Sequence, residues 1–118
     1  MAEAAHQAGM RAVVGEVLYD FPSPNYGPIE AGFAYTEQMV AKWRDDPLIT
    51  IAVEPHSPYL CAPDLLRRAG EMARRHDIPL VIHLAETRSE VETIQERHGV
   101  TPVRHLANLD LLYPGLLA

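Results

Sequence analysis

The sequence has little cysteine, no basic surplus and no long apolar run, and each shortage excludes a class of protein. Its one cysteine, Cys61, excludes an internal disulfide and a cysteine-rich zinc site, because both need more than one thiol. The formal net charge is −6, with both signs mixed along the chain, so the basic face that nucleic acid binding requires is missing. No apolar run reaches the ~20 residues that cross a bilayer, so we expect no membrane partner.

The first residues, MAEAAHQAGMR, also lack the apolar core of a signal peptide, and we expect a cytoplasmic protein. A chain of 118 residues, 47% hydrophobic and 22% charged, has the balance of one folded globular unit with a modest core. No repeat or linker divides it. Since thiols are so scarce, any bound metal must be held by histidine and carboxylate.

Two hydrophobic periods alternate along the chain. Short apolar runs rich in Val and Ile predict three parallel strands covered on both faces: Arg11–Tyr19, Leu48–Pro55 and Ile78–Ala85. Helical periodicity and capping residues predict four helices: Ala34–Arg44, Pro63–His76, a segment opened by a capping box of Thr87 and Glu90 and ended by Gly99, and Thr101–Leu112. The order predicts an α/β fold with right-handed crossovers.

Two segments lie outside this alternation. Asp20–Gly32 contains three prolines, two glycines and an asparagine, which predicts a surface loop after the first strand. The final residues, GLLA, are compatible with the start of a further strand.

Polar residues of chemical interest follow the second and third predicted strands. His56 comes directly after the second, His83 lies near the end of the third, and Glu86 follows three residues later. Ligands of parallel α/β folds bind at the carboxyl ends of the strands. A neutral imidazole can bind a divalent metal, and a nearby carboxylate can move protons to and from metal-bound water. His83 and Glu86 therefore form a candidate hydrolytic pair.

Each candidate also has a structural interpretation. His83 suits a hydrogen-bonded residue at a strand end, Glu86 suits the dipole of a helix start, and His56 suits an exposed loop. Cys61 has no base near it in the sequence, which favours a buried or helix-start residue. Solvated helix faces explain the remaining histidines: His6, His76, His98 and His105.

The stretch EPHSPYLCAPDLLRRAGEMARRHDIPLVIHLAETRSEVE resembles the amidohydrolase superfamily, in the branch of the methylthioadenosine/S-adenosylhomocysteine deaminases and triazine chlorohydrolases. The resemblance extends from AGMRAVVGEV to LANLDLL. It implies a partial (β/α)8 TIM barrel covering roughly strands three to five with their helices. It also implies hydrolytic deamination or dechlorination of a heterocycle, such as a purine nucleoside, by water activated on a divalent metal, zinc or alternatively iron.

The resemblance assigns a role to each candidate. His83 matches the metal ligand of strand five, Glu86 the carboxylate that transfers the proton and contacts substrate, and His56 the substrate-binding histidine of strand four. Glu16 to Tyr35 contains no Lys or Arg, whereas nucleoside-deaminating members hold the nucleoside with basic residues after strand three. This departure favours another heterocycle over an adenosine.

Much of the family's metal site is absent. The His-x-His pair, the histidine after strand six and the aspartate after strand eight do not occur here, and a complete barrel takes ~250 residues. We therefore expect residues 1–118 to be the central, incomplete segment of a hydrolase barrel, inactive by itself. The alternative is a non-catalytic α/β fragment. In either case the open sheet edges favour pairing with the rest of the barrel or with a second copy, as a homo-oligomer.

Overall fold

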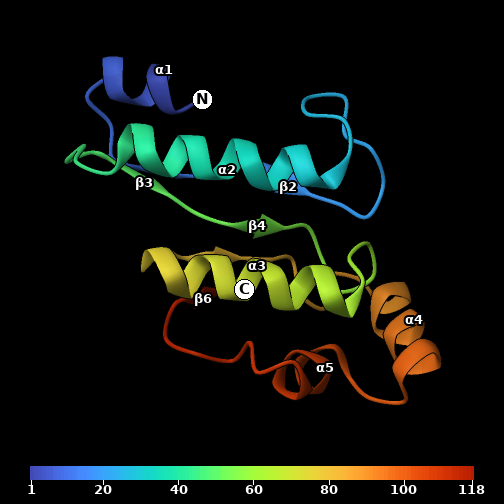
Figure 1. Ribbon diagram of the computed structural model, residues 1–118. Helices are drawn as coiled ribbons and strands as arrows, with labels where there is room; N and C mark the ends of the chain where they lie inside the picture. The colour runs from blue at the N-terminus through green and yellow to red at the C-terminus, as the bar shows by residue number, and fades with distance from the viewer.

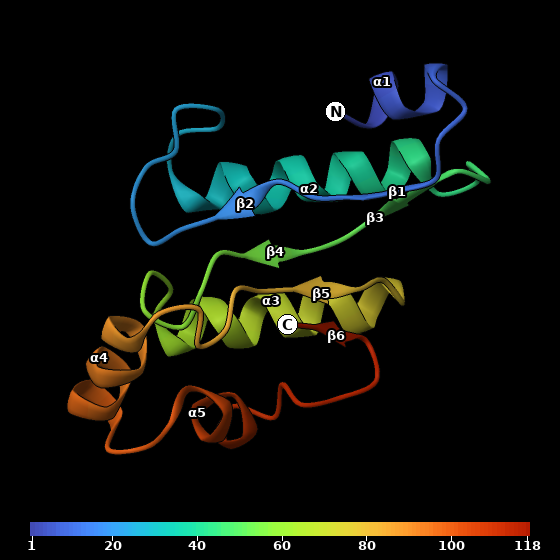
Figure 2. The same cartoon turned by 180° about the vertical axis from the view of Figure 1, so that it is seen from behind.

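The computed structural model describes all 118 residues as an alternation of short strands and helices. The elements are α1 (Ala2–Gln7), β1 (Ala12–Val14), β2 (Val17–Leu18), α2 (Ile29–Trp43), β3 (Ile49–Ile51), β4 (Glu54–Pro55), α3 (Pro63–His76), β5 (Leu80–Val81), α4 (Arg88–His98), α5 (Pro102–Asn108) and β6 (Leu116–Leu117). Both views show α2 and α3 side by side on one side of the strands (Figure 1, Figure 2). No helix has the length and apolar character needed to traverse a bilayer.

The strands are all parallel and lie in the order of the chain. β1 pairs with β3, β2 with β4 and β5 with β6. A further parallel bridge joins Val53 to Leu80 and connects the second pair to the third. The prediction of parallel strands is confirmed, and Leu116–Leu117 confirm a further strand at the end of the sequence.

Each predicted strand is longer than the paired segments observed. Arg11–Tyr19 divides into β1 and β2 because the backbone passes very close to the neighbouring strand at Gly15. A Cβ atom at Gly15 would lie 2.6 Å from Cγ of Glu54 and 2.8 Å from the carbonyl oxygen of Ala52, so only glycine fits there. Leu48–Pro55 likewise divides into β3 and β4, and only Leu80–Val81 of the third prediction forms a regular strand.

The predicted helices agree with the structure to different degrees. Pro63–His76 is confirmed at both ends, and α4 follows the Thr87 cap and ends before Gly99 as predicted. The prediction for α2 was wrong at its start: the helix begins at Ile29 after an extended Pro28, so the surface loop ends there and not at Gly32. Proline at the cap needs no N–H partner, and its extended conformation precedes the first helical residue.

The fourth helix is shorter than Thr101–Leu112, and α1 was not predicted. α5 ends at Asn108, after which Asp110 adopts a left-handed conformation with φ of 59°. This reversal of the chain lets Leu109 and Leu111 enter the core instead of continuing the helix. Burial of these side chains outweighs the helical preference of the local sequence.

The core lies between the helices and one face of the strands. A large apolar cluster joins α3 and α5 to the sheet, and a smaller one lies under α1 and α2. Leu66 on α3 is fully buried, which contributes about 1.5–3 kcal/mol by removal from water. The prediction that both faces are covered was wrong: Val13 is 50% exposed and Leu117 is 51% exposed, because no second layer within these residues covers their face of the strands.

Candidate functional site

The candidate site lies at the carboxyl ends of β2, β4 and β5, where backbone hydrogen bonds continue beyond the regular strands. The N–H of His56 donates to the carbonyl of Leu18 at 3.1 Å, and the N–H of His83 donates to the carbonyl of His56 at 2.9 Å. These bonds bring the two imidazole rings to a centroid distance of 5.1 Å. The structure therefore brings His56 and His83 together, as their positions after neighbouring strands predicted.

Ser57 fixes the ring of His56. Nδ1 of His56 lies 3.0 Å from the hydroxyl oxygen of Ser57, and Ser57 is fully buried. Burial and the positive charge of His83 lower the pKa of His56. The carboxylates of Glu86 and Glu90 oppose this shift without cancelling it. Burial and His83 both favour the neutral form of His56, and Nε2 makes no hydrogen bond within the chain, so it can donate to or accept from a ligand.

Hydrogen bonds anchor the loop after His56 to β2 and to α4. The buried thiol of Cys61 donates to the carbonyl of Leu18 at 3.3 Å, and Arg97 on α4 donates to the carbonyl of Tyr59 at 3.0 Å. Burial is the main cause that raises the pKa of Cys61 to about 11, so its thiol is inert at neutral pH. The prediction of a buried structural cysteine is confirmed.

His83 borders a small hollow on the open face of the sheet. Its volume is about 130 Å³, and its lining residues come from three strands: Val17, Glu54, Pro55, His56, Val81, Ile82 and His83. The imidazole of His83 is exposed and makes no hydrogen bond within the chain. His83 is thus accessible for a ligand, which the interpretation as a hydrogen-bonded structural residue does not provide.

Glu54 was missed by the sequence analysis although it lines the same hollow. Burial raises its pKa; the charge of His83 acts in the opposite direction, and Glu16 adds to the rise. A period of two along the strand places Glu54 on the same face as His56. This alternation was the signal that would have identified it.

Glu86 lies in the turn between β5 and α4, at the same edge as the histidines. Its side chain is exposed, and its carboxylate accepts no hydrogen bond within the chain. It acts on His56 through its charge. Glu86 precedes the Thr87 cap and is outside the helix, and its free carboxylate is accessible to a ligand at this edge.

Aromatic side chains lie close to the ring of His56. Tyr19 stacks on Phe21 at a centroid distance of 4.7 Å and lies 5.4 Å from the ring of His56. Tyr59 meets the same imidazole edge-on at 6.0 Å. Phe21 is 48% exposed. The site thus combines two imidazoles and a carboxylate with aromatic faces, which suits a planar, partly polar ligand.

The donor set for a metal is incomplete within this chain. No group of three or more His, Cys, Asp or Glu side chains lies close enough together to hold a metal ion. A catalytic zinc site usually takes three protein ligands. His83 therefore fits as one ligand of a larger set, and residues 1–118 do not hold a metal by themselves.

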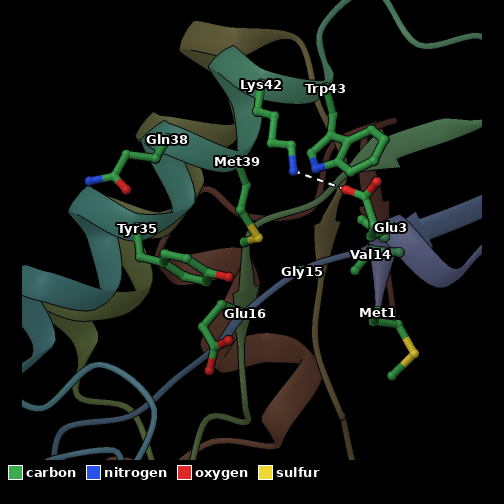
Figure 3. Close-up of a pocket in the computed structure, with 11 residues that line it drawn as sticks. Met1, Glu3, Val14, Gly15, Glu16, Tyr35, Gln38, Met39, Lys42 and Trp43 are labelled. Atoms are coloured by element: carbon green, nitrogen blue, oxygen red, sulfur yellow. Dashed lines mark hydrogen bonds and ion pairs between the residues drawn. The ribbon is translucent and has the colours of Figure 1, made fainter. Parts of the chain in front are cut away.

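A second hollow has a lining that contains neither His56 nor His83. It has a volume of about 330 Å³ and lies beside β1, between α1 and α2. Figure 3 shows Lys42 of α2 paired with Glu3 of α1 across it, while Tyr35 and Met39 point toward the strand. The hollow contains no histidine. It marks an incompletely covered edge and adds no metal ligand to the site.

The parallel strands, the helices on one face and the histidines at the carboxyl edge define an α/β protein with a candidate site at the carboxyl ends of its strands. The profile of the Amidohydrolase family matches residues 1–116. The chain therefore belongs to the amidohydrolase family, as the sequence resemblance predicted.

Relatives in this family share most of the chain. It is 59% identical, over its whole length, to 27% of the 5-methylthioadenosine/S-adenosylhomocysteine deaminase of Syntrophobacter fumaroxidans. It is 46% identical, over 99% of its length, to 26% of the corresponding deaminase 1 of Syntrophus aciditrophicus. The chain thus spans about a quarter of the length of these relatives.

Solved structures resemble the fold closely. An adenosine deaminase from Xanthomonas campestris with bound zinc matches with a TM-score of 0.94 and 35% identity, over 98% of this chain and 26% of the other. The atrazine chlorohydrolase of Arthrobacter aurescens in complex with zinc matches with a TM-score of 0.81 and 18% identity, over 97% of this chain and 27% of the other. The second match concerns the fold alone.

Proposed function

We propose that this chain forms part of a metal-dependent aminohydrolase that deaminates a heterocycle by hydrolysis. The observation that carries the proposal is the pair of imidazoles 5.1 Å apart at the carboxyl ends of neighbouring parallel strands, with Glu86 three residues beyond His83. His83 supplies one metal ligand, Glu86 transfers the proton, and His56 binds the substrate. The deaminases among the relatives support this assignment.

The fold that fits this role is a partial (β/α)8 barrel. We assign β1 and β2 to strand three, β3 and β4 to strand four, β5 to strand five and β6 to the beginning of strand six. The parallel pairing in chain order supports the assignment. So does the face that carries Val13, Glu54 and His83, since it corresponds to a barrel interior that the remaining strands would close.

The chemistry divides among the three residues. A divalent metal, zinc by comparison with the solved relatives, would activate the attacking water. Neutral His56, oriented by Ser57, offers Nε2 to a ring heteroatom of the substrate. The free carboxylate of Glu86 holds the proton taken from water and returns it to the departing amino group, which leaves as ammonia.

Purine nucleosides with a modified 5′ position are the substrates that we place first. The support is the 59% identity to a 5-methylthioadenosine/S-adenosylhomocysteine deaminase. The absence of Lys and Arg from Glu16 to Tyr35 is the observation that favours another heterocycle, because this segment offers no cation to hold a nucleoside. Triazines are the second class to test.

The direct experiment uses the full-length polypeptide that contains this chain. Ammonia release from 5′-methylthioadenosine, S-adenosylhomocysteine and a chlorotriazine identifies the reaction, and metal analysis gives the bound ion. His83→Ala should lower both metal content and turnover, whereas His98→Ala, at an exposed histidine on α4, should preserve both. Metal retention in His83→Ala would refute the ligand assignment. A metal-loaded wild-type protein that releases no ammonia would refute the reaction.

A non-catalytic role through open strand edges is the second candidate. β1 and β6 each pair on one side only, and Val13 and Leu117 on them are half exposed. Unpaired edges favour association with another chain, including a second copy in a homo-oligomer. Sedimentation of the purified 118-residue chain distinguishes the cases: self-association supports pairing through the edges, and a cooperatively folding monomer contradicts it.

A further inference from the structure

Glu90 is a buried carboxylate that takes no direct part in the proposed chemistry. It lies in the first turn of α4, is only 3% exposed and makes no ion pair. A buried carboxylate is costly unless hydrogen bonds replace its hydration. Its oxygens accept two of them: from the N–H of Ala85 at 3.2 Å and from the N–H of Glu86 at 2.8 Å.

These bonds depart from an ordinary capping box. The first half is present, because the N–H of Glu90 donates to the hydroxyl of Thr87 at 3.1 Å. In the usual second half, the carboxylate returns to the N–H of the cap residue itself. Here it reaches one and two residues farther back, outside the helix. The carboxylate thus binds the turn that lies between His83 and Glu86.

The turn needs such a restraint. Ala85 has a φ of 55°, a left-handed conformation that is unfavourable for a residue with a Cβ atom. Strained backbone of this kind persists where surrounding contacts enforce it, and it is concentrated at functional sites. Of the residues that separate His83 from Glu86, Ala85 is the strained one, so its conformation sets how the two side chains are presented.

We infer that Glu90 is a positioning residue, which fixes the orientation of Glu86 relative to His83 by binding the N–H groups of Ala85 and Glu86 with one carboxylate. The effect of this restraint on catalysis rests on the proposed function. The restraint itself rests on the two hydrogen bonds and the burial of Glu90. Both N–H groups belong to residues outside α4, so the two bonds restrain the turn before the helix.

Glu90→Gln in the metal-loaded full-length protein tests the inference. Glutamine offers a single acceptor oxygen, so the two N–H groups no longer share a carboxylate. We expect kcat to fall about 10- to 100-fold, as is typical when the support of an active-site group is lost, with KM and metal content little changed. Glu92→Gln is the matched control, because Glu92 is exposed on the same helix and pairs only with Arg88.

Thr87→Ala separates positioning from helix stability. It removes the hydroxyl that caps α4 and leaves the carboxylate of Glu90 in place. We expect it to lower the melting temperature while kcat, measured well below that temperature, is retained. An equal loss of kcat in Thr87→Ala and Glu90→Gln would overturn the inference. If Glu90→Gln does not accumulate as folded protein, Glu90→Asp replaces it. Aspartate keeps the charge, but its side chain is too short to bond both N–H groups, so the same loss of kcat is expected.

Amide hydrogen exchange provides a readout that is independent of turnover. The amides of Ala85 and Glu86 should exchange faster in Glu90→Gln than in the wild type or in Glu92→Gln. Unchanged exchange would overturn the restraint, and faster exchange with wild-type kcat would overturn its catalytic consequence. If the wild type deaminates no heterocycle, the proposed function fails, while the exchange data still decide whether Glu90 holds the turn.

Discussion

The two ends of the parallel strands use the same residue types in opposite ways. At the amino end, Asp46 accepts hydrogen bonds from the N–H groups of Leu48 and Ile49 at 2.9 and 3.0 Å and pairs with Nδ1 of His6 at 2.7 Å. At the carboxyl end, the imidazole of His83 and the carboxylate of Glu86 are exposed and unpaired. Asp46 and His6 act as structural partners at one end, whereas His83 and Glu86 remain available at the other.

A second pair strengthens this contrast. His76, at the end of α3, lies with Nε2 2.7 Å from a carboxylate oxygen of Glu37 on α2. It borders the hollow near Asp46 at the amino end. In (β/α)8 barrels, the fold that we propose for the full-length protein, the amino end is associated with stability and the carboxyl end with chemistry. The difference teaches that a free side chain on a fixed backbone, rather than the residue type, marks the functional end.

Among the substitutions at the carboxyl ends of the strands, Glu86→Gln should have the largest effect on turnover. In the full-length protein we expect turnover to fall roughly 100-fold or more, because general acid–base assistance is typically of that size. The metal content should remain that of the wild type, since Glu86 is not proposed as a ligand. Loss of metal in Glu86→Gln, measured by elemental analysis, would show that Glu86 is a metal ligand. That result would contradict the roles assigned to Glu86 and His83.

His56→Ala should have a smaller effect at the same end. Loss of one hydrogen bond to the substrate predicts a decrease of roughly tenfold in kcat/KM, with unchanged metal stoichiometry. Steady-state kinetics and metal analysis on the same preparation check both parts, with His98→Ala as the control. A variant that had lost its metal would place His56 among the ligands and not against the substrate.

Asp46→Asn addresses the amino end, where we expect lower thermal stability and unchanged kcat. Desolvation raises the pKa of Asp46, but the hydrogen bonds from Leu48 and Ile49, together with His6, outweigh it, so the net pKa lies below the ordinary value of 3.8. Its stabilisation is therefore fully present above the unfolded pKa and is lost as the pH falls through the lower folded value.

Thermal melting of wild type and Asp46→Asn as a function of pH measures this contribution. The difference in melting temperature should be present at neutral pH and should shrink under strongly acidic conditions. A change in kcat without a change in melting temperature would contradict the division of roles between the two ends.

Cys61 gives the smallest expected effect, because it lies at the carboxyl end without being part of the chemistry. With a pKa of about 11 and 3% exposure, its thiol should resist alkylation at neutral pH in the folded protein and react after denaturation. Peptide mapping by mass spectrometry detects modification at this position. Rapid alkylation accompanied by loss of turnover would show that the loop after His56 opens, contrary to its observed anchoring.

Much of the architecture follows from local sequence. Pro63 at a helix start and Thr87 with Gly99 at the two ends of α4 determined helix boundaries, because capping satisfies backbone groups locally. The start of α2 and the end of α5 could not be predicted in the same way. They depend on the burial of Phe33 in one case and of Leu111 in the other, and burial is a property of the assembled core.

The candidate site shows the same division. The sequence by itself determined that His56, His83 and Glu86 follow apolar strands, and the family resemblance assigned their roles. Only the tertiary structure decided that the two rings lie 5.1 Å apart and that Glu54 shares their hollow. It also directed the carboxylate of Glu90 to the turn before its helix. Spacing along a chain specifies which residues a strand end presents, whereas contacts between strands and the strained backbone at Ala85 arise only when the elements pack together.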